Sequence, residues 1–376
     1  MKIYFLRSSP VTELDAERFG YKILKRKFEI KFLDVTKIFN KNHIHYVNLK
    51  NFENIDNIQF SNLDELKSYI LSNPPNFIID YLKFGFKENK IRIFLKKNKI
   101  KLIRNIYHGP KPNLISPLDN KSFLKKFLFR TSNYLKKIIV DFFFVKFDYY
   151  LIPGLSVFKN YNINEKSGKA IKTVSLDYDK SIQLNKINIK VSKNYSVFID
   201  QDFPNHIDHK IKKRQPQISE DEYFPLLSNF FNKYENIYDT KIVIAAHPKS
   251  STKFENFFKQ EILHGYTSEL IRDSNEVFAH YSTAISFAVI FKKPIIFLTS
   301  NNLKKSRVGK GIVDYSNLLN SPLVNMDEFT CNPKEIEKKI NEKKYNSFYR
   351  QFIKCSEINN KSSWEIFSDF LESSIK

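Results

Sequence analysis

Four polar turns in the second half of the chain each follow an apolar run, and their side chains suit phosphate binding and proton transfer. The turns are Asp200-Gln201-Asp202, His247-Pro248-Lys249-Ser250, His280-Tyr281-Ser282-Thr283 and Thr299-Ser300. In an open parallel sheet, ligands bind at the carboxyl ends of the strands. The recurrence of these turns therefore predicts a binding site for an anionic ligand at one edge of a sheet.

The turn that begins with His247 carries the strongest chemical signal. Pro248 gives no N–H to a strand ladder and turns the chain outward, so the imidazole of His247 is expected at the rim of the sheet. There it can donate to a phosphate oxygen or protonate a leaving group, and Lys249 and Ser250 add a charge and a hydroxyl. The alternative is a purely structural histidine at a strand end.

Ser282 and Thr283 stand where the predicted helix 283–292 begins. Their hydroxyls can cap that helix, and its free N–H groups can bind an anion. A plain N-cap is the alternative, but the neighbouring His-Pro turn favours phosphate binding. Thr267, which opens the predicted helix 267–273, and His280 complete the expected nucleotide site. Neither GxGxxG nor GxxxxGKS occurs, so a dinucleotide fingerprint and a P-loop are both excluded.

The elements that would position these turns alternate between strand and helix patterns in both halves of the chain. Runs typical of strands are 2–8, 28–36, 76–82, 149–154, 195–202, 241–248, 276–281 and 294–300. Helices are predicted over 12–27 with Thr12 as N-cap, over 63–72, and over 219–237. Ser219 and Glu222 fit a capping box for the last of these, whereas Pro225 indicates a later start.

This rhythm predicts an α/β protein with two Rossmann-like, doubly wound domains that face a cleft. The expected domains are 1–175, on the acceptor side, and 190–355, which binds the nucleotide. Residues 356–376 are expected to form a final helix that crosses back to the first domain.

The residues 244–250, IAAHPKS, and 264–297, HGYTSELIRDSNEVFAHYSTAISFAVIFKKPIIF, resemble a group of bacterial transferases. Sialyltransferases and polysialyltransferases of the GT-B class have an HP motif and a later SS or ST motif that grip the CMP part of a CMP-sugar, and capsule-type Kdo transferases share the HP motif. The resemblance covers about residues 195–300. It implies that His247 corresponds to the HP histidine and that Ser282 and Thr283 correspond to the SS/ST pair.

The catalytic base is not fixed by this resemblance, because the acidic D/E-D/E-G motif of the sialyltransferases is missing. Asp200 and Asp202 are the nearest acidic pair, although no glycine follows them. Further candidates are His108, Asp177 and Asp179. Capping of turns or helices is the alternative role for the aspartates.

The amino-acid composition limits the classes of partner that the protein is expected to bind. The 376 residues carry a net charge of +22, which favours anionic partners, although the abundance of Lys, Asn, Ile, Phe and Tyr is also typical of A+T-rich coding DNA. The lysines are spread along the chain, and no nucleic-acid-binding motif occurs. Residues 121–147 are basic and amphipathic, so they are expected either on an anionic membrane surface or packed on the core. Cys331 and Cys355 have no metal-ligand spacing, and no metal is expected.

Together these observations predict a metal-independent GT-B glycosyltransferase without a cofactor. It would transfer a sugar, from a CMP-linked nonulosonic or Kdo-type donor, to a surface glycan such as lipopolysaccharide, lipooligosaccharide or capsule. The alternatives are a CDP-polyol-phosphate transferase, a UDP-sugar epimerase, and a non-enzymatic basic module that binds lipid or nucleic acid. No signal peptide and no run of about 18 apolar residues is visible, so a cytoplasmic location, with peripheral contact to the inner face of the cytoplasmic membrane, is expected.

Overall fold

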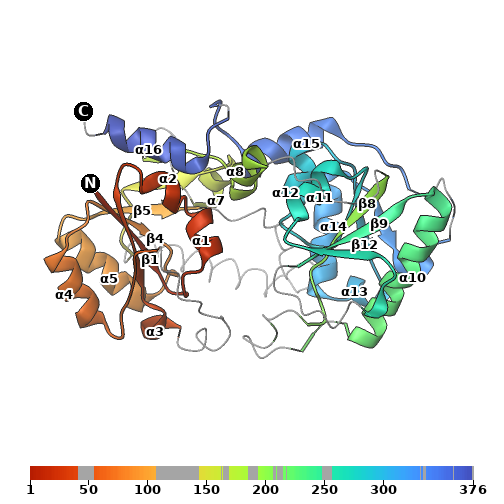
Figure 1. Cartoon of the computed structure of the whole chain (residues 1–376), viewed down its shortest axis with the longest axis horizontal. Helices are drawn as coiled ribbons and strands as arrows, with labels where there is room; N and C mark the ends of the chain where they lie inside the picture. The colour runs from red at the N-terminus through yellow and green to blue at the C-terminus, as the bar shows by residue number, and fades with distance from the viewer. Residues whose placement is uncertain are drawn as a thin grey trace, which may run out of the picture. The chain divides into compact units, whose positions relative to one another are not determined.

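The computed structural model shows two compact α/β units, each built on its own parallel sheet (Figure 1). The described residues are 1–40, 55–106, 144–161, 163, 169–184, 194–205, 209, 215–216, 218–247, 256–330, 332, 336–358 and 360–374. The first unit holds the described residues up to Leu176 together with those from Cys355 onward. The second unit holds the described residues between Asp177 and Lys354.

The first unit contains seven strands in the order β3-β2-β1-β4-β5-β6-β7, and neighbouring strands are parallel. The strands are β1 (Lys2–Arg7), β2 (Glu29–Asp34), β3 (Asn57–Gln59), β4 (Phe77–Asp80), β5 (Lys101–Asn105), β6 (Tyr149–Ile152) and β7 (Ala170–Lys172). Strands β1 and β4 are almost wholly buried, as expected when helices cover both faces of a parallel sheet.

Helices pack on both faces of the first sheet. They are α1 (Glu13–Arg18), α2 (Tyr21–Leu24), α3 (Thr36–Phe39), α4 (Leu63–Ser72), α5 (Phe86–Lys97), α7 (Ser156–Tyr161) and α16 (Ser363–Ser373). Leu66 of α4 and Ile91 of α5 share a core with Tyr4 and Ile78 from the sheet. On the opposite face, Phe5 of β1 packs against Phe19 and Trp364, so α16 covers the same face as the first helices.

The first helical segment differs from the prediction of one helix over 12–27. Thr12 is the N-cap of α1, as predicted, and it also forms a capping box with Asp15 that was not predicted. The chain then breaks at Gly20, which has a φ of 61° and opens the separate α2. A Cβ at Gly20 would lie 2.2 Å from Cγ of Trp364, so the close approach of α16 and the left-handed backbone both require glycine here.

The second unit contains six strands in the order β10-β9-β8-β11-β12-β13, and neighbouring strands are again parallel. They are β8 (Tyr195–Ile199), β9 (Lys241–Ala246), β10 (Glu261–His264), β11 (Val277–Ala279), β12 (Ile295–Thr299) and β13 (Leu323–Asn325). The helices are α8 (Leu176–Gln183), α10 (Glu220–Tyr238), α11 (Thr267–Asp273), α12 (Ile285–Ile290), α13 (Asn301–Lys304), α14 (Arg307–Leu319) and α15 (Glu342–Phe348). A 3-10 turn (Met326–Glu328) and a π-helical turn (Tyr349–Ile353) complete the described elements.

Helix α10 begins at Glu220, so Pro225 lies inside it and does not delay its start. The predicted capping box is also wrong, because Ser219 is the N-cap but makes no side-chain capping bond. The helix buries Tyr223, Phe230 and other aromatic residues against the second sheet. This packing stabilises the segment enough to outweigh the hydrogen bond that proline removes.

The predicted fold class is confirmed in each unit, since both sheets are parallel and alternate with helices. Among the described residues, no helix is long and apolar enough to span a bilayer.

Candidate functional site

The loop after β8 occupies the middle of the predicted site, because β8 lies between β9 and β11 in the second sheet. Asp200 is the first residue of this loop and is 5% exposed. Its Oδ1 accepts from the backbone N–H of Asp202 at 2.8 Å, and its Oδ2 accepts from the backbone N–H of His247 at 3.2 Å. The carboxylate therefore joins the loop after β8 to the turn after β9.

Burial raises the pKa of the Asp200 carboxyl above its usual value, and hydrogen bonds from the backbone amides of Asp202, His247 and Gln201 oppose that rise. An enzyme's general base must reach the hydroxyl that it deprotonates. The Asp200 oxygens instead accept backbone bonds beneath the surface. Asp202 is 2% exposed, with a left-handed φ of 46°. These placements favour the turn-forming role for both aspartates over the predicted role of base.

Gln201 makes the matching connection on the other side of β8. Its Oε1 accepts from the backbone N–H of Tyr281 at 2.6 Å, and its Nε2 donates to the backbone carbonyl of the same residue. The side-chain amide thus pairs with Tyr281 as a neighbouring strand would. Residues 200 and 201 therefore connect the turn after β8 to the turns after both flanking strands.

His247 directly follows the last residue of β9 and is half-buried, so its position at the end of the strand agrees with the prediction. Pro248, Lys249 and Ser250 lie outside the described residues.

A second histidine, which the sequence analysis missed, stands on the adjacent strand. His264 pairs with Ala246 in the β10–β9 register, so it lies level with the residue that precedes His247. It is exposed, and it lies near enough to Asp200 to oppose, to a small extent, the rise in the pKa of that carboxyl that burial causes. The sequence signal for it is a His-Gly pair, His264-Gly265, at the end of the short run Glu261–His264.

Ser282 and Thr283 lie in the turn between β11 and α12, as predicted. The Oγ of Ser282 accepts from the backbone N–H of Ala284 at 3.2 Å, and the carbonyl of Thr283 accepts from Ser286 at 3.1 Å. Helix α12 begins at Ile285, two residues later than predicted, so Ser282 closes a turn before the helix and is not its N-cap. Thr283 is exposed and Ser282 is half-buried, which leaves both hydroxyls close to the surface.

Tyr281, which precedes this pair, is held by close packing. Its ring lies 5.3 Å from that of Tyr315, and a Cβ at Gly311 would come within 2.6 Å of its ring. Gly311 therefore makes room for the ring on α14, a role that the sequence analysis did not predict.

His280 does not stand at the surface, contrary to its place in the predicted nucleotide site. Its side chain is 0% exposed and packs among the rings of Phe198, Phe203 and Tyr223. Nδ1 donates to the carbonyl of Leu298 at 2.7 Å, which leaves Nε2 as an acceptor with no hydrogen-bond partner among the described residues. Burial lowers the pKa of this imidazole to about 4, so the ring is neutral at pH 7.

The remaining candidates are dispersed. Thr267 is the first residue of α11 and is half-buried. Asp177 and Asp179 lie in the first turn of α8, where Asp179 is 7% exposed. Ser300 is buried and caps α13 through Leu303, and His108 lies outside the described residues.

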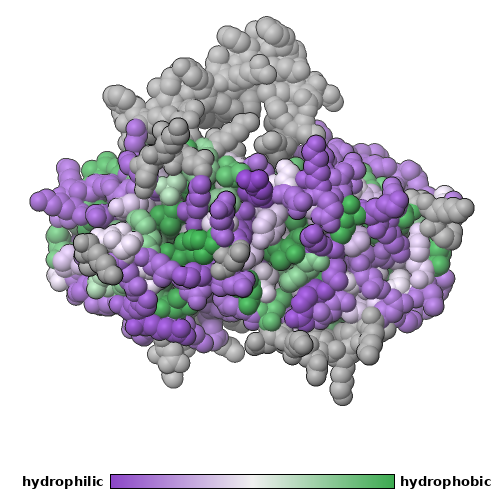
Figure 2. Space-filling view, turned by 90° about the horizontal axis from the view of Figure 1, so that it is seen from above, coloured by the Kyte–Doolittle hydropathy of each residue, from purple (hydrophilic) through white to green (hydrophobic). Residues whose placement is uncertain are grey.

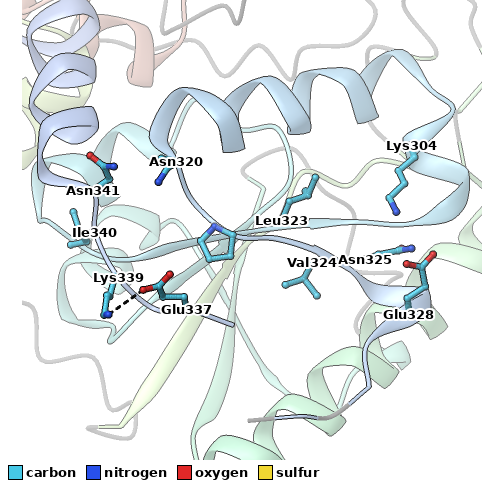
Figure 3. Close-up of a pocket in the computed structure, with 11 residues that line it drawn as sticks. Lys304, Asn320, Leu323, Val324, Asn325, Glu328, Glu337, Lys339, Ile340 and Asn341 are labelled. Atoms are coloured by element: carbon cyan, nitrogen blue, oxygen red, sulfur yellow. Dashed lines mark ion pairs between the residues drawn. The ribbon is translucent and has the colours of Figure 1, made fainter. Parts of the chain in front are cut away.

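A hollow of about 680 Å³ lies elsewhere in the second unit, beside the edge strand β13 (Figure 3). Figure 3 shows Glu337 and Lys339 on an extended segment next to β13, joined by an ion pair of 3.1 Å. None of the predicted site residues lines this hollow. Within the described part of the chain, no group of three or more His, Cys, Asp or Glu side chains is placed to hold a metal ion.

Comparison with solved structures supports the fold. A variant of the wall teichoic acid polymerase TagF is 14% identical, with a TM-score of 0.54, and the match covers 100% of this chain and 90% of that one. A UDP-N-acetylglucosamine 2-epimerase, described as putative and from Listeria monocytogenes, is 10% identical, with a TM-score of 0.51 and coverage of 100% and 96%. At such identities the likeness shows a GT-B fold alone. No protein-family model matches the sequence, and no curated protein matches it significantly.

Proposed function

We propose that this chain is a GT-B glycosyltransferase that binds the nucleotide of its donor at the carboxyl edge of the second sheet. The observation that carries the proposal is the pair of connections made by Asp200 and Gln201. They hold the turn with His247 and the turn with Ser282 and Thr283 on either side of β8. Rigid support of this kind is what a binding site requires if its side chains are to meet a ligand in one geometry.

The chemistry at this edge suits a nucleotide phosphate. His247 and the exposed His264 stand at the ends of adjacent strands, and Ser282 and Thr283 offer hydroxyl donors on the other side of β8. Imidazole and hydroxyl groups bind phosphate oxygens and stabilise negative charge on a departing phosphate. In this proposal His247 takes that role, while Asp200 holds its backbone in place.

We further propose a cytidine nucleotide as the donor. The resemblance of His247 and the Ser282-Thr283 pair to CMP-sugar transferases supports it. A TagF structure obtained with CDPG, the donor CDP-glycerol, shares the fold, with a TM-score of 0.53. The first choice is therefore a CMP-linked sugar acid, and the second is a CDP-linked polyol phosphate, passed to a surface glycan or glycolipid. A UDP-sugar epimerase is the alternative that the Listeria structure keeps open.

A thermal-shift comparison of CMP, CDP, UDP and GDP with the full chain tests the proposal. A ligand that binds only the native state stabilises it by about 2.7 kcal/mol at one hundred times its Kd. We expect a shift with CMP or CDP that is lost in His247→Ala and kept in a Lys343→Gln control on α15. A shift with UDP alone would point to the epimerase, and no shift with any nucleotide would overturn the proposed site.

A further inference from the structure

The most exposed large apolar side chains of the described residues are unevenly distributed. They are Leu71, Phe84, Phe86, Ile93, Phe257, Tyr266 and Ile358. Three of the seven fall between residues 84 and 93, in the turn after β4 and on α5. On the face seen in Figure 2, hydrophobic residues are interspersed among hydrophilic ones, so single exposed residues are ordinary. Two exposed aromatic rings close together in the sequence, Phe84 and Phe86, are less ordinary.

These two phenylalanines are fixed from beneath. The guanidinium groups of Arg92 and Arg104 lie 5.3 Å and 4.9 Å from the ring of Phe84, and both arginines pair with the buried Asp80. Phe84 nevertheless remains 47% exposed. Phe86 packs against the ring of Phe144 at 5.4 Å and remains 66% exposed. Rings anchored on one side and open on the other are suited to contact with a partner.

Lysines lie close to these rings in the sequence. Lys83, Lys87 and Lys90 are exposed, and none of them forms an ion pair within the described part of the chain. The single acid of α5, Glu88, is half-buried. Phe86, Lys90 and Ile93 follow a spacing of four and three residues, so they share one side of the helix. The surface therefore combines apolar rings with uncompensated positive charge.

We propose that this surface, formed by Lys83, Phe84, Phe86, Lys87, Lys90 and Ile93, docks on an anionic phospholipid membrane. Aromatic rings and aliphatic side chains enter the interfacial region of a bilayer, while lysines stay at the level of the headgroups and attract anionic lipids. The surface lies at the start of α5, which follows the carboxyl end of β4. It is independent of the proposed reaction and of the second unit.

The charge pattern separates a membrane from other occupants. A second copy of the chain docking by two-fold symmetry would bring the same lysines together, which costs free energy through repulsion. A negatively charged membrane matches both the rings and the lysines. The end of the basic segment 121–147 packs beneath this surface, because Val145 donates to the buried Asn89 at 3.0 Å and the buried ring of Phe147 lies 6.2 Å from that of Phe84.

The test is co-sedimentation of the full chain with vesicles of phosphatidylcholine, with and without about one third phosphatidylglycerol. Two variants remove the surface: Phe84→Ser with Phe86→Ser, and Lys83→Gln with Lys87→Gln and Lys90→Gln. Two matched controls remove equal features elsewhere: Leu71→Ser with Ile358→Ser, and Lys310→Gln with Lys343→Gln and Lys344→Gln. The lysine substitutions are at exposed positions and should keep the melting temperature, whereas loss of the Phe84 and Phe86 rings removes their contacts with Arg92, Arg104 and Phe144, so binding is compared per folded molecule below each variant's melting transition.

We expect the unaltered chain and both controls to bind the anionic vesicles. Each surface variant should lose at least about tenfold in partitioning, and the lysine variant should lose most at low salt. Equal binding by surface variants and controls overturns the proposal. An unaltered chain that does not bind anionic vesicles also overturns the proposal. This includes a chain that self-associates through this surface, as measured by light scattering, and a chain that binds DNA but no vesicles.

Discussion

Strands at the centre of both sheets end in a buried aspartate, and in each case the carboxylate accepts the backbone N–H two residues further on. Asp80, the last residue of β4, accepts from Leu82 at 2.6 Å, and Asp200, the residue after β8, accepts from Asp202 at 2.8 Å. The same local turn is used differently in the two units. Asp80 also pairs with Arg92 at 2.6 Å, whereas Asp200 forms no ion pair within the described part of the chain.

The two carboxylates therefore differ in role: Asp80 stabilises the first unit, whereas Asp200 supports the proposed binding site. In the first unit, Asp80 forms ion pairs with an arginine of α5 and an arginine of β5, and these pairs stabilise the packing of that unit. In the second unit, Asp200 instead bonds to the backbone that carries His247. Removing Asp80's partner should therefore cost stability, whereas changes around Asp200 should cost binding and turnover.

The largest effect is expected from Arg92→Met. This change leaves the buried Asp80 carboxylate with Arg104 alone, and breaking a buried pair in this way costs about 3–5 kcal/mol. The single tryptophan of the chain, Trp364, lies in the first unit, so its fluorescence during urea unfolding reports this loss.

Lys96→Met is the matched control for Arg92→Met, because the pair of Lys96 with Asp148 is partly exposed. It should cost less than about 1 kcal/mol. Equal losses of unfolding free energy from the two changes would contradict the larger contribution that we assign to the buried pair of Asp80 and Arg92.

His247→Ala should act on turnover and not on stability. If this imidazole meets the donor phosphate, its loss should lower turnover about 10²–10³-fold, because a group that stabilises developing charge is missing. The urea midpoint should stay close to that of the unaltered protein, since the ring is half-buried at the end of a strand. Turnover per folded molecule measures this. A stability loss with normal turnover would make His247 structural.

The buried His280 should make the second unit sensitive to acid. The folded pKa of about 4 lies below the ordinary value of 6.5, so between these values the unfolded chain binds a proton that the folded chain does not. Stability should therefore fall as the pH drops from 7 to 5, by about 2 kcal/mol for this group.

Urea unfolding of the unaltered chain and of His280→Gln, each at pH 7 and pH 5, isolates this contribution. Circular dichroism follows the unfolding of both units, whereas the fluorescence of Trp364 reports the first, so the second unit is read from the part of the circular-dichroism transition that the fluorescence does not share. The variant should lose most of the acid sensitivity of the second unit. An unchanged dependence on pH would mean that His280 has the same pKa in the folded and the unfolded chain.

The smallest effect is expected from Gln201→Ala. It removes two hydrogen bonds to the backbone of Tyr281 and should cost about 1 kcal/mol of stability. We also expect it to weaken nucleotide binding several-fold, because the turn with Ser282 and Thr283 loses its connection to β8.

Gln260→Ala is the control for Gln201→Ala, since the Gln260 amide likewise makes two side-chain hydrogen bonds, but to Asn232 and Glu235. It should lower stability to a similar degree and leave nucleotide affinity unchanged. A Gln201→Ala protein that binds nucleotide normally would remove the support that we assign to this residue.

The layered α/β fold could be predicted from the sequence because long apolar runs alternate with helical patterns. Of the four short edge strands, β3, β10 and β13 were missed, since three or four residues with polar members carry little pattern. The break at Gly20 depends on Trp364, more than three hundred positions away, and no local signal could place it.

The predicted site was found only in outline. Polar residues at strand ends located the turns with His247 and Ser282, because that inference needs only the strand boundaries. The pairing of Gln201 with Tyr281 spans 80 residues and depends on which strands are neighbours. The burial of His280 could not be foreseen for the same reason, since its surroundings come from separate elements.

The contact between Trp364 and Gly20 also bears on the order in which the protein can be made. The first unit needs α16 to cover β1, but α16 is translated only after the whole second unit. During synthesis, the face of β1 around Phe5 therefore stays uncovered while the second unit emerges from the ribosome. The second unit, whose described residues all lie between Asp177 and Lys354, can fold first, and the first unit is completed last.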